Sequence, residues 1–307
     1  MENHRSHPKQ QQLLAALALL LATASWGSTF FIVKRAIAEI DLYSFLFLRF
    51  SLSAVCMMLL FGRRIVRQAR RTAGASAVTG IFLVNAYITQ TEGLRFTSAA
   101  NSALITCLYT VLIPIFLFLG LGKKSRITPS TAVGIMLSLV GMYLLTCFGL
   151  TSFNRGDLIT LICAVACALH VIFVGRYTIR KGLTAFVTLQ FLFVALTCGA
   201  IAAGRGSLEI KFSPFVWFAL FITAIVSTVF AFILQIWAQR ILPADRTGVI
   251  LAMEAVFGAL FAWTLGAENP TLISFAGACL MVAGMILSES NLLRKRGDRV
   301  VPVMSPP

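Results

Sequence analysis

The sequence predicts an all-α integral membrane protein in which ten transmembrane helices form two inverted five-helix repeats. Three observations lead to this prediction. The 307 residues are 58% hydrophobic and only 12% charged, and the mean hydropathy is +0.88, whereas soluble domains carry about 25% charged residues. The apolar residues form runs of membrane-spanning length, and the second half of the chain repeats features of the first half.

Ten apolar runs come close to the roughly 20 residues that a helix needs to cross the hydrocarbon core of a bilayer. They are 13–33, 42–62, 75–93, 98–121, 128–148, 156–175, 184–203, 215–240, 245–266 and 270–289, and the polar tails are 1–12 and 290–307. The first run contains Ala22-Thr23-Ala24, which resembles a signal-peptide cleavage site. Because the run continues to Val33, we expect an uncleaved spanning helix.

The positions of the basic residues predict the orientation in the membrane. Nineteen of the 26 Lys and Arg residues lie in the tails or in connections on the N-terminal side, six lie in connections on the other side, and Arg49 lies inside a run. Connections rich in Lys and Arg face the cytoplasm, so we expect both termini there. The net charge of +15 thus reflects topology. No basic stretch carries the interleaved aromatics of a nucleic-acid surface, so no nucleic-acid partner is expected.

An internal repeat relates the two halves of the chain. Runs four and nine correspond at an offset of 145 residues, and Leu48-Arg49-Phe50 corresponds to Leu189-Gln190-Phe191. Runs five and ten share a pattern at an offset of 143, in which Gly134, Leu137, Gly141, Met142 and Leu144 match Gly277, Leu280, Gly284, Met285 and Leu287. Since each copy has five helices, the second copy must cross the membrane in the opposite sense. Such inverted repeats are typical of alternating-access carriers, with the site near the midplane between the copies.

The glycines of runs five and ten allow two interpretations. Gly134 and Gly141, like Gly277 and Gly284, lie seven residues apart on one helix face. Small residues on one face allow helices to approach closely. The pattern therefore predicts close packing, either within the bundle or between two copies of the chain.

Short motifs in both halves resemble the drug/metabolite transporter superfamily, specifically its EamA-type ten-helix members. They are Trp26-Gly27-Ser28, Leu48-Arg49-Phe50, the stretch EGLRFTSA at 92–99 and the stretch LGAENPT at 265–271. The resemblance implies EamA-like repeats at 13–148 and 156–289, and a secondary transporter in the bacterial inner membrane that exports small polar or amphipathic metabolites such as amino acids. We expect a monomer or a homodimer. The chain departs from the family where Thr110-Val111-Leu112 replaces Pro-Val-Phe, with Pro114 displaced.

Polar residues within membrane spans are candidates for a functional site. Glu254 lies nine residues into its run, about 13 Å deep at the helical rise, and its carboxyl group could bind substrate and exchange a proton. Alternatively, it could join neighbouring helices as a hydrogen-bonded acid. The other candidates for substrate binding are His170, Trp26, Ser28, Asn85, Tyr87, Asn101, Tyr109 and Gln235. For each of these, a role in helix packing is the alternative.

Arg49 is the charged residue in the middle of FLFLRFSLSA. It lies seven residues from the outer start of its run, about 10 Å below the interface. Its long side chain could reach that interface or cap the end of a neighbouring helix. Because the repeat places Gln190 at the equivalent position, we predict that Arg49 and Gln190 have a structural, hydrogen-bonding role. A role of Arg49 in the working site is the alternative.

The sequence offers little for catalysis. All seven cysteines lie in apolar runs without metal-ligand spacing, and two of the three histidines lie in the N-terminal tail. A lipid-modifying enzyme would need clustered His, Asp or Glu. We therefore expect no enzyme activity, metal or cofactor, and we expect a small-molecule substrate and membrane lipids as partners. A channel or a non-transporting membrane partner stays open as an alternative.

Overall fold

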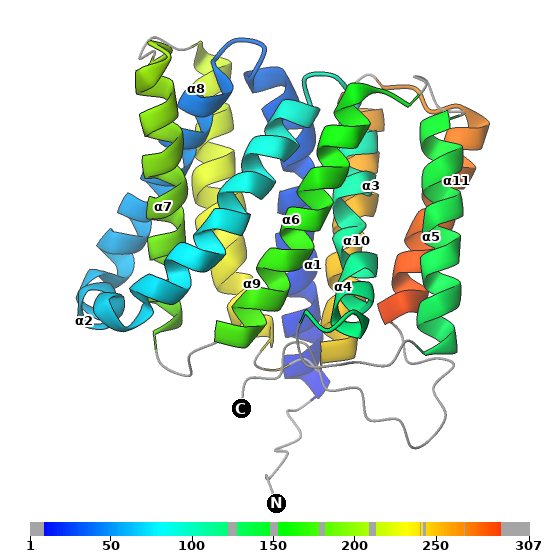
Figure 1. The fold of residues 1–307 in the computed structure, drawn as a ribbon, viewed down its shortest axis with the longest axis horizontal. Helices are drawn as coiled ribbons and strands as arrows, with labels where there is room; N and C mark the ends of the chain where they lie inside the picture. Colours follow the sequence, from blue (N-terminus) through cyan, green and yellow to red (C-terminus); the bar gives the residue numbers. More distant parts are fainter. Residues whose placement is uncertain are drawn as a thin grey trace, which may run out of the picture.

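A computed structural model describes residues 9–121, 128–147, 153–177, 182–208, 213–239, 241, 244–266 and 268–289. These residues form a bundle of helices that stand roughly side by side, and the described ranges contain no strand (Figure 1). In chain order the elements are α1 (Lys9–Ala36), α2 (Leu42–Gly93), α3 (Ala99–Cys107), α4 (Tyr109–Phe118), α5 (Pro129–Cys147), α6 (Arg155–Tyr177), α7 (Leu183–Gly204), α8 (Pro214–Phe221), η1 (Ile222–Phe230), α9 (Ala231–Gln239), α10 (Ala244–Thr264) and α11 (Leu272–Glu289).

Several helices have the length and composition of membrane spans. Within the described residues there are six such helices: Gln10–Ala36, Leu42–Gly93, Ala99–Phe118, Arg155–Val174, Leu183–Gly204 and Pro214–Gln235. Three shorter apolar helices accompany them: Pro129–Leu144, Met253–Thr264 and Leu272–Leu287. Large apolar side chains lie on the outside of the bundle, with Leu59 83% and Leu272 84% exposed. Such a surface suits contact with lipid rather than water.

The second and third predicted helices form one continuous helical element, α2, of 52 residues. A straight helix would separate Phe50 from Tyr87 by about 55 Å. Their ring centroids are instead 4.6 Å apart, so α2 folds back on itself into two antiparallel arms (Figure 1). The two predicted spans thus occur as arms, although the predicted interruption between 62 and 75 occurs as a bend in the helix.

Two other predicted helices are interrupted in the structure. The run 98–121 divides at Leu108 into α3 and α4, and Pro114 lies inside α4, where it lacks an N–H for the helical hydrogen bond. The run 215–240 divides into α8, a π-helix (η1) of nine residues, and α9. π-Helices usually occur as single turns and often lie at functional sites, so η1 is unusual in length.

Short polar residues begin several of these helices. The Asp41 carboxylate accepts hydrogen bonds from the backbone N–H groups of Tyr43 and Ser44 at the start of α2. The Ser98 hydroxyl accepts from the N–H of Asn101 at the start of α3. These contacts satisfy N–H groups that have no partner within the helix, and they place the helix starts at the ends of the bundle.

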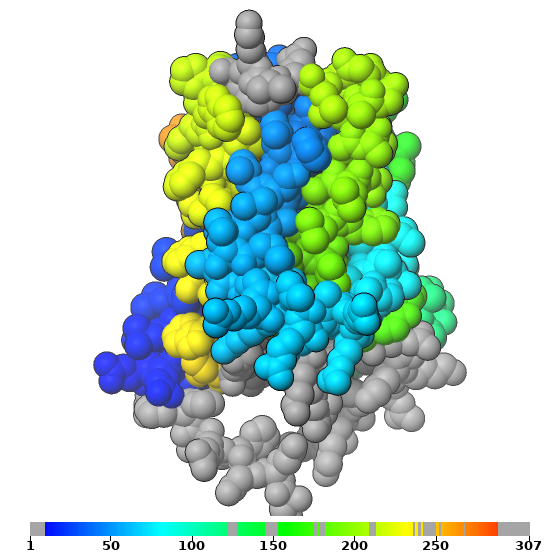
Figure 2. Space-filling model, turned by 90° about the vertical axis from the view of Figure 1, so that its left-hand side faces the viewer, coloured from blue at the N-terminus to red at the C-terminus, as the bar shows by residue number. Residues whose placement is uncertain are grey.

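Corresponding helices of the two halves run in opposite directions, as an inverted repeat requires. In Figure 1, α1 runs upward and α6 downward, and the first arm of α2 runs downward beside the rising α7. The Ser44 hydroxyl at the start of α2 donates to the Ser207 carbonyl just beyond α7, at 2.7 Å. Near the bend of α2, the Ser76 hydroxyl donates to the Phe186 carbonyl at the start of α7, at 3.0 Å. Figure 2 shows α2 between α7 and the yellow segment that contains α8, η1 and α9.

The glycine stripes of the fifth and last predicted helices face each other across α5 and α11. A Cβ atom added to Gly141 would lie 2.5 Å from the Met281 nitrogen, and one added to Gly284 would lie 2.5 Å from Ser138 Oγ. The backbones of α5 and α11 therefore touch, which is possible only without side chains at these positions. Of the two interpretations of this pattern, the structure supports packing within the chain.

This close contact predicts the effect of a small substitution. Gly284→Ala should lower the free energy of unfolding by about 1–3 kcal/mol, because the added methyl group overlaps the backbone of α5. Gly74→Ala is the matched control, since a Cβ atom there meets no other atom within 4 Å. Thermal unfolding of the two purified variants in detergent tests this expectation. Equal melting temperatures for both variants would contradict it.

Candidate functional site

A polar cluster lies where α1 and α2 cross η1. We call it the α1–α2–η1 junction and define it by six residues: Ser25, Trp26, Arg49, Ser53, Ser227 and Thr228. The Trp26 Nε1–H donates to the Ser227 carbonyl at 2.6 Å, and the Ser25 and Ser227 hydroxyls lie 2.7 Å apart. The Ser53 hydroxyl donates to the Ala224 carbonyl at 3.1 Å. Side chains from two different helices thus bind the backbone and hydroxyl groups of η1.

Arg49 is the charged member of the α1–α2–η1 junction. Only 3% of its surface is exposed, and the structural role predicted for it from the sequence stays a prediction. Its Nε and Nη2 atoms donate to Thr228 Oγ1 at 3.4 and 3.3 Å. Its Cζ atom lies 4.9 Å from the centroid of the Tyr87 ring, a distance at which the ring face attracts a cation.

The hydroxyl residues of η1 match its π-helical geometry. The Thr228 hydroxyl donates to the Thr223 carbonyl five residues earlier, at 2.7 Å, which is the spacing of a π-helix rather than an α-helix. Thr228 Oγ1 can therefore donate to its own helix while its lone pairs accept from Arg49. In this way η1 supplies an acceptor for a buried charge.

Glu254 lies in α10 within a second group of titratable side chains. Its carboxyl group is close enough to interact electrostatically with Tyr87 of α2, Cys107 of α3 and Cys167 of α6. It is half-buried, and it makes no hydrogen bond or ion pair to any described residue, since the ion pairs there join Lys34 to Glu268 and Arg95 to Glu92. Tyr87 lies close to both Glu254 and Arg49 and so connects the two groups.

His170 and Gln190 contact each other directly. His170 Nε2 and Gln190 Oε1 are 2.7 Å apart, joining α6 to α7. Gln190 is buried, with 3% of its surface exposed, and its amide also donates to the Phe186 carbonyl at 3.4 Å. A residue predicted to bind substrate and one predicted to be structural thus form one pair, and their roles stay predictions.

The remaining candidates lie in different surroundings. The Ser28 hydroxyl donates to the Ser25 carbonyl within α1, next to the α1–α2–η1 junction. The Asn85 side chain is exposed, and its amide donates to the Ile81 carbonyl of its own helix. Asn101 is buried in the first turn of α3, and Gln235 is half-buried in α9. Tyr109 packs against an apolar cluster of Ile113, Leu117, Ala168 and Ile172. Their part in substrate binding stays a prediction.

A further set of contacts joins the two halves at the opposite end of the bundle from the start of α1. The Lys34 ammonium donates to the Thr97 carbonyl at 2.8 Å and pairs with the Glu268 carboxylate at 3.4 Å. The same carboxylate accepts from the N–H groups of Ala99 and Ala100 at the start of α3, at 2.7 and 3.1 Å. A carboxylate at a helix N-terminus is stabilised by the helix dipole. Lys34 and α3 belong to the first half of the chain and Glu268 to the second.

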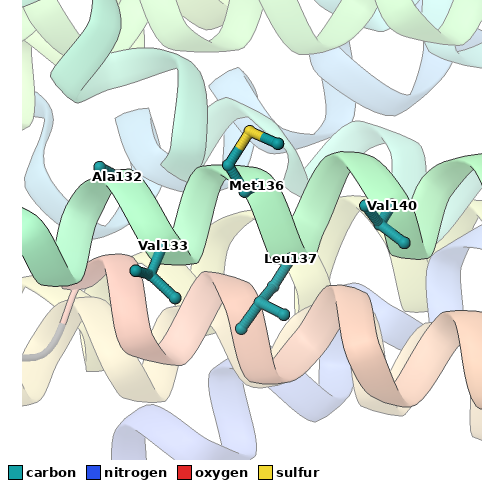
Figure 3. Close-up of a pocket in the computed structure, with 5 residues that line it drawn as sticks. All are labelled: Ala132, Val133, Met136, Leu137 and Val140. Carbon is teal, nitrogen blue, oxygen red and sulfur yellow. The ribbon is translucent and has the colours of Figure 1, made fainter.

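A groove of about 300 Å³ runs along α5, away from these polar groups. Its lining residues are Ala132, Val133, Met136, Leu137 and Val140, all of them apolar (Figure 3). Figure 3 shows Leu137 and Val133 directed toward the neighbouring salmon-coloured helix. The lining offers no hydrogen-bonding side chain, so this groove suits a lipid chain better than a polar solute.

Sequence analysis missed four of the six residues of the α1–α2–η1 junction. Ser25, Ser53, Ser227 and Thr228 were not among the candidates, although Ser227 and Thr228 interrupt the apolar run AIVSTVF as adjacent hydroxyl residues. An adjacent hydroxyl pair in a span is a weak signal by itself, because such side chains often bond their own helix. Only the contact with Arg49 and Trp26 distinguishes this pair.

Comparison with known proteins relates both halves of the chain to one family. The profile of the EamA-like transporter family matches residues 13–147 and, a second time, residues 154–289. A protein from Archaeoglobus fulgidus named only as an uncharacterized transporter is 29% identical over 277 residues, which is 90% of this chain and 86% of the relative. The uncharacterized transporter YoaV of Bacillus subtilis is 19% identical over 299 residues, covering 91% of this chain and 98% of the relative.

A solved crystal structure is similar in fold. It aligns with a TM-score of 0.65 at 18% identity and covers 92% of this chain and 99% of the other. The helices described above therefore adopt an arrangement that an experiment has seen in another protein.

The contact between Arg49 and Thr228 predicts a stability difference. Thr228→Val should lower the free energy of unfolding by about 1–2 kcal/mol, because it removes the oxygen that accepts from a buried guanidinium. Thr264→Val is the matched control: Thr264 is exposed and its hydroxyl donates only to the Leu260 carbonyl of its own helix. Thermal unfolding in detergent compares the two variants. An equally small effect of both would show that the Thr228 oxygen contributes nothing to holding Arg49.

Proposed function

Because this chain belongs to the EamA-like transporter family, with a match to each of its halves, we propose that it is a secondary transporter exporting small polar or amphipathic metabolites, such as amino acids, by alternating access. The family membership makes it a multi-pass membrane protein with a small-molecule substrate. The export direction, the metabolite class and the mechanism are our proposal.

One observation carries this proposal: polar contacts inside the bundle join the first copy to the second. Trp26 and Arg49 come from the first copy, and Ser227 and Thr228, which accept their hydrogen bonds, come from the second. In carriers built from inverted repeats, the substrate site lies between the copies and opens to alternate sides as the copies move. The α1–α2–η1 junction lies at such a boundary.

The contacts around Glu268 support the same mechanism. The Glu268 carboxylate of the second copy holds Lys34 and the start of α3, both from the first copy. These contacts keep the copies together at one end of the bundle. For the bundle to open at that end, they must separate, and exposure to water lowers the cost of separating such charges.

We place this transporter in a bacterial inner membrane with ten crossings. This count is supported by the six long apolar helices and the three shorter ones, with the two arms of α2 counted separately. The start of α1 and the end of α11 lie on the same side of the bundle (Figure 1), as an even number of crossings requires. The distribution of Lys and Arg supports a cytoplasmic position for that side, and the protein acts as a monomer or homodimer.

Glu254 is the proposed proton-coupling residue. Its carboxyl group interacts electrostatically with Tyr87, Cys107 and Cys167 and is not paired with a described cation. An acid without a salt-bridge partner can lose and regain its proton without breaking an ion pair. A carrier that changes conformation only with this group in one protonation state would couple transport to the proton gradient.

The export proposal is tested by comparing the metabolites in the medium of a deletion strain and an overexpressing strain. A compound depleted in the first medium and enriched in the second identifies the substrate. The purified protein in proteoliposomes should then show saturable counterflow of that compound. Flux that rises linearly with concentration and shows no counterflow would indicate a channel instead.

The coupling proposal predicts the behaviour of Glu254→Gln. This variant should retain counterflow but lose the dependence of net transport on pH, because an amide cannot carry the proton. Glu92→Gln is the matched control, since Glu92 lies in a partly exposed ion pair with Arg95 at the end of α2. An unchanged pH profile of net transport in Glu254→Gln would refute a coupling role for Glu254.

A further inference from the structure

We propose that Arg49 binds a carboxylate group of the transported solute, so that the substrates of this carrier are carboxylate-bearing metabolites. This inference rests on the proposed transport function and narrows its substrate class. It assigns Arg49 a role that differs from the structural role predicted from the sequence.

The first argument is the missing counter-charge. Arg49 is 3% exposed, and the ion pairs of the described residues do not include it. Glu254, the acid within the bundle that interacts with Tyr87, forms no ion pair with Arg49. A buried cation without a partner is costly in a membrane protein, and such charges usually mark substrate or ion pathways. A bound anion would supply the missing charge.

The second argument is the geometry of the guanidinium group, which carries five N–H donors in a planar fork. Thr228 Oγ1 occupies one edge, formed by Nε and Nη2. The edge formed by Nη1 and the second N–H of Nη2 makes no hydrogen bond to a described residue. Two parallel N–H groups on one edge match the two oxygens of a carboxylate. Thr228 thus orients the group, and no described residue occupies the edge that would bind the carboxylate.

The third argument is access. In the described part of the chain, the buried side-chain nitrogens and oxygens that are sealed from solvent without a hydrogen bond belong to Ser102 and Asn154. Arg49 Nη1 is not among them, although it has no hydrogen-bond partner there. Arg49 as a whole residue keeps 3% of its surface exposed, so it is not completely sealed inside the bundle.

The fourth argument is the contrast with Gln190, the repeat counterpart of Arg49. Gln190 is equally buried, and both ends of its amide are occupied, by His170 and by the Phe186 carbonyl. In the second copy, a neutral side chain therefore makes the hydrogen bonds that a structural role requires. Arg49 carries a full charge and more donors than its surroundings use, and a structural role does not account for the excess. The surrounding rings, Tyr87 and Phe50, lie 4.9 and 5.5 Å from Cζ and hold the group in place.

The test uses the full-length protein in proteoliposomes and two sets of probes. One set is the twenty amino acids presented together, and the other is the matching amines that lack the carboxyl group. Mass spectrometry measures which compounds the vesicles accumulate. We expect amino acids to be taken up at least 10-fold faster than the matching amines, as loss of charge-assisted hydrogen bonds implies.

The variants separate binding from folding. Arg49→Gln should reduce amino-acid uptake about 10- to 100-fold and abolish the preference over amines. Arg49→Lys keeps the charge but loses the planar fork of N–H donors, and it should reduce the preference for amino acids over amines about 10-fold. This second variant carries the test if Arg49→Gln fails to fold. Arg95→Gln changes an exposed arginine and serves as the matched control.

Each outcome bears on one of the two proposals. If wild-type protein accumulates amines as fast as amino acids, or if a folded Arg49 variant keeps the wild-type preference, the carboxylate site is wrong and the carrier function stands. If wild-type protein accumulates neither set, the proposed export of this metabolite class fails, and this inference fails with it.

Discussion

The centre of this structure depends on how one buried charge, Arg49, is held inside an apolar bundle. Arg49 lies in a membrane-spanning arm of α2, and the residue has almost no exposed surface. Thr228 of η1 accepts hydrogen bonds from two of its nitrogens. An ordinary α-helix uses its carbonyls and hydroxyls internally. The π-helical segment places Thr228 where it bonds its own backbone and also receives Arg49. The departure from regular helix thus occurs at the point where a neighbouring charge needs an acceptor.

The two copies of the repeat are interleaved rather than placed side by side. The first arm of α2 packs along α7, and α5 packs along α11 through facing glycines. Helices in lipid gain little from hydrophobic association, so close backbone contact and interhelical hydrogen bonds hold them together. The contacts of Glu268 at one end illustrate a set that spans both copies.

Much of the fold was predictable because spanning helices leave a strong signal in the sequence. The apolar runs, the glycine stripes and the opposite sense of the two halves all appear in the structure as expected, and the family match covers both repeats. The interruptions were less predictable. The apolar run around Thr228 reads as a regular helix, and the bend of α2 occurs without a proline. The π-helical interruption coincides with the contacts that Ser227 and Thr228 receive from Trp26 and Arg49 of neighbouring helices, which local propensity does not reveal.

The sequence by itself determined the class of protein, its two-copy architecture and its polar candidates, because apolar length and repeated patterns are local properties. Only the tertiary structure decided which of these candidates meet. It paired His170 with Gln190, directed Asn85 to an exposed face, and joined Arg49 to Thr228. Arg49 and Thr228 are 179 residues apart in sequence. No local pattern can show which donors of a buried arginine are satisfied, because that depends on the helices packed around it.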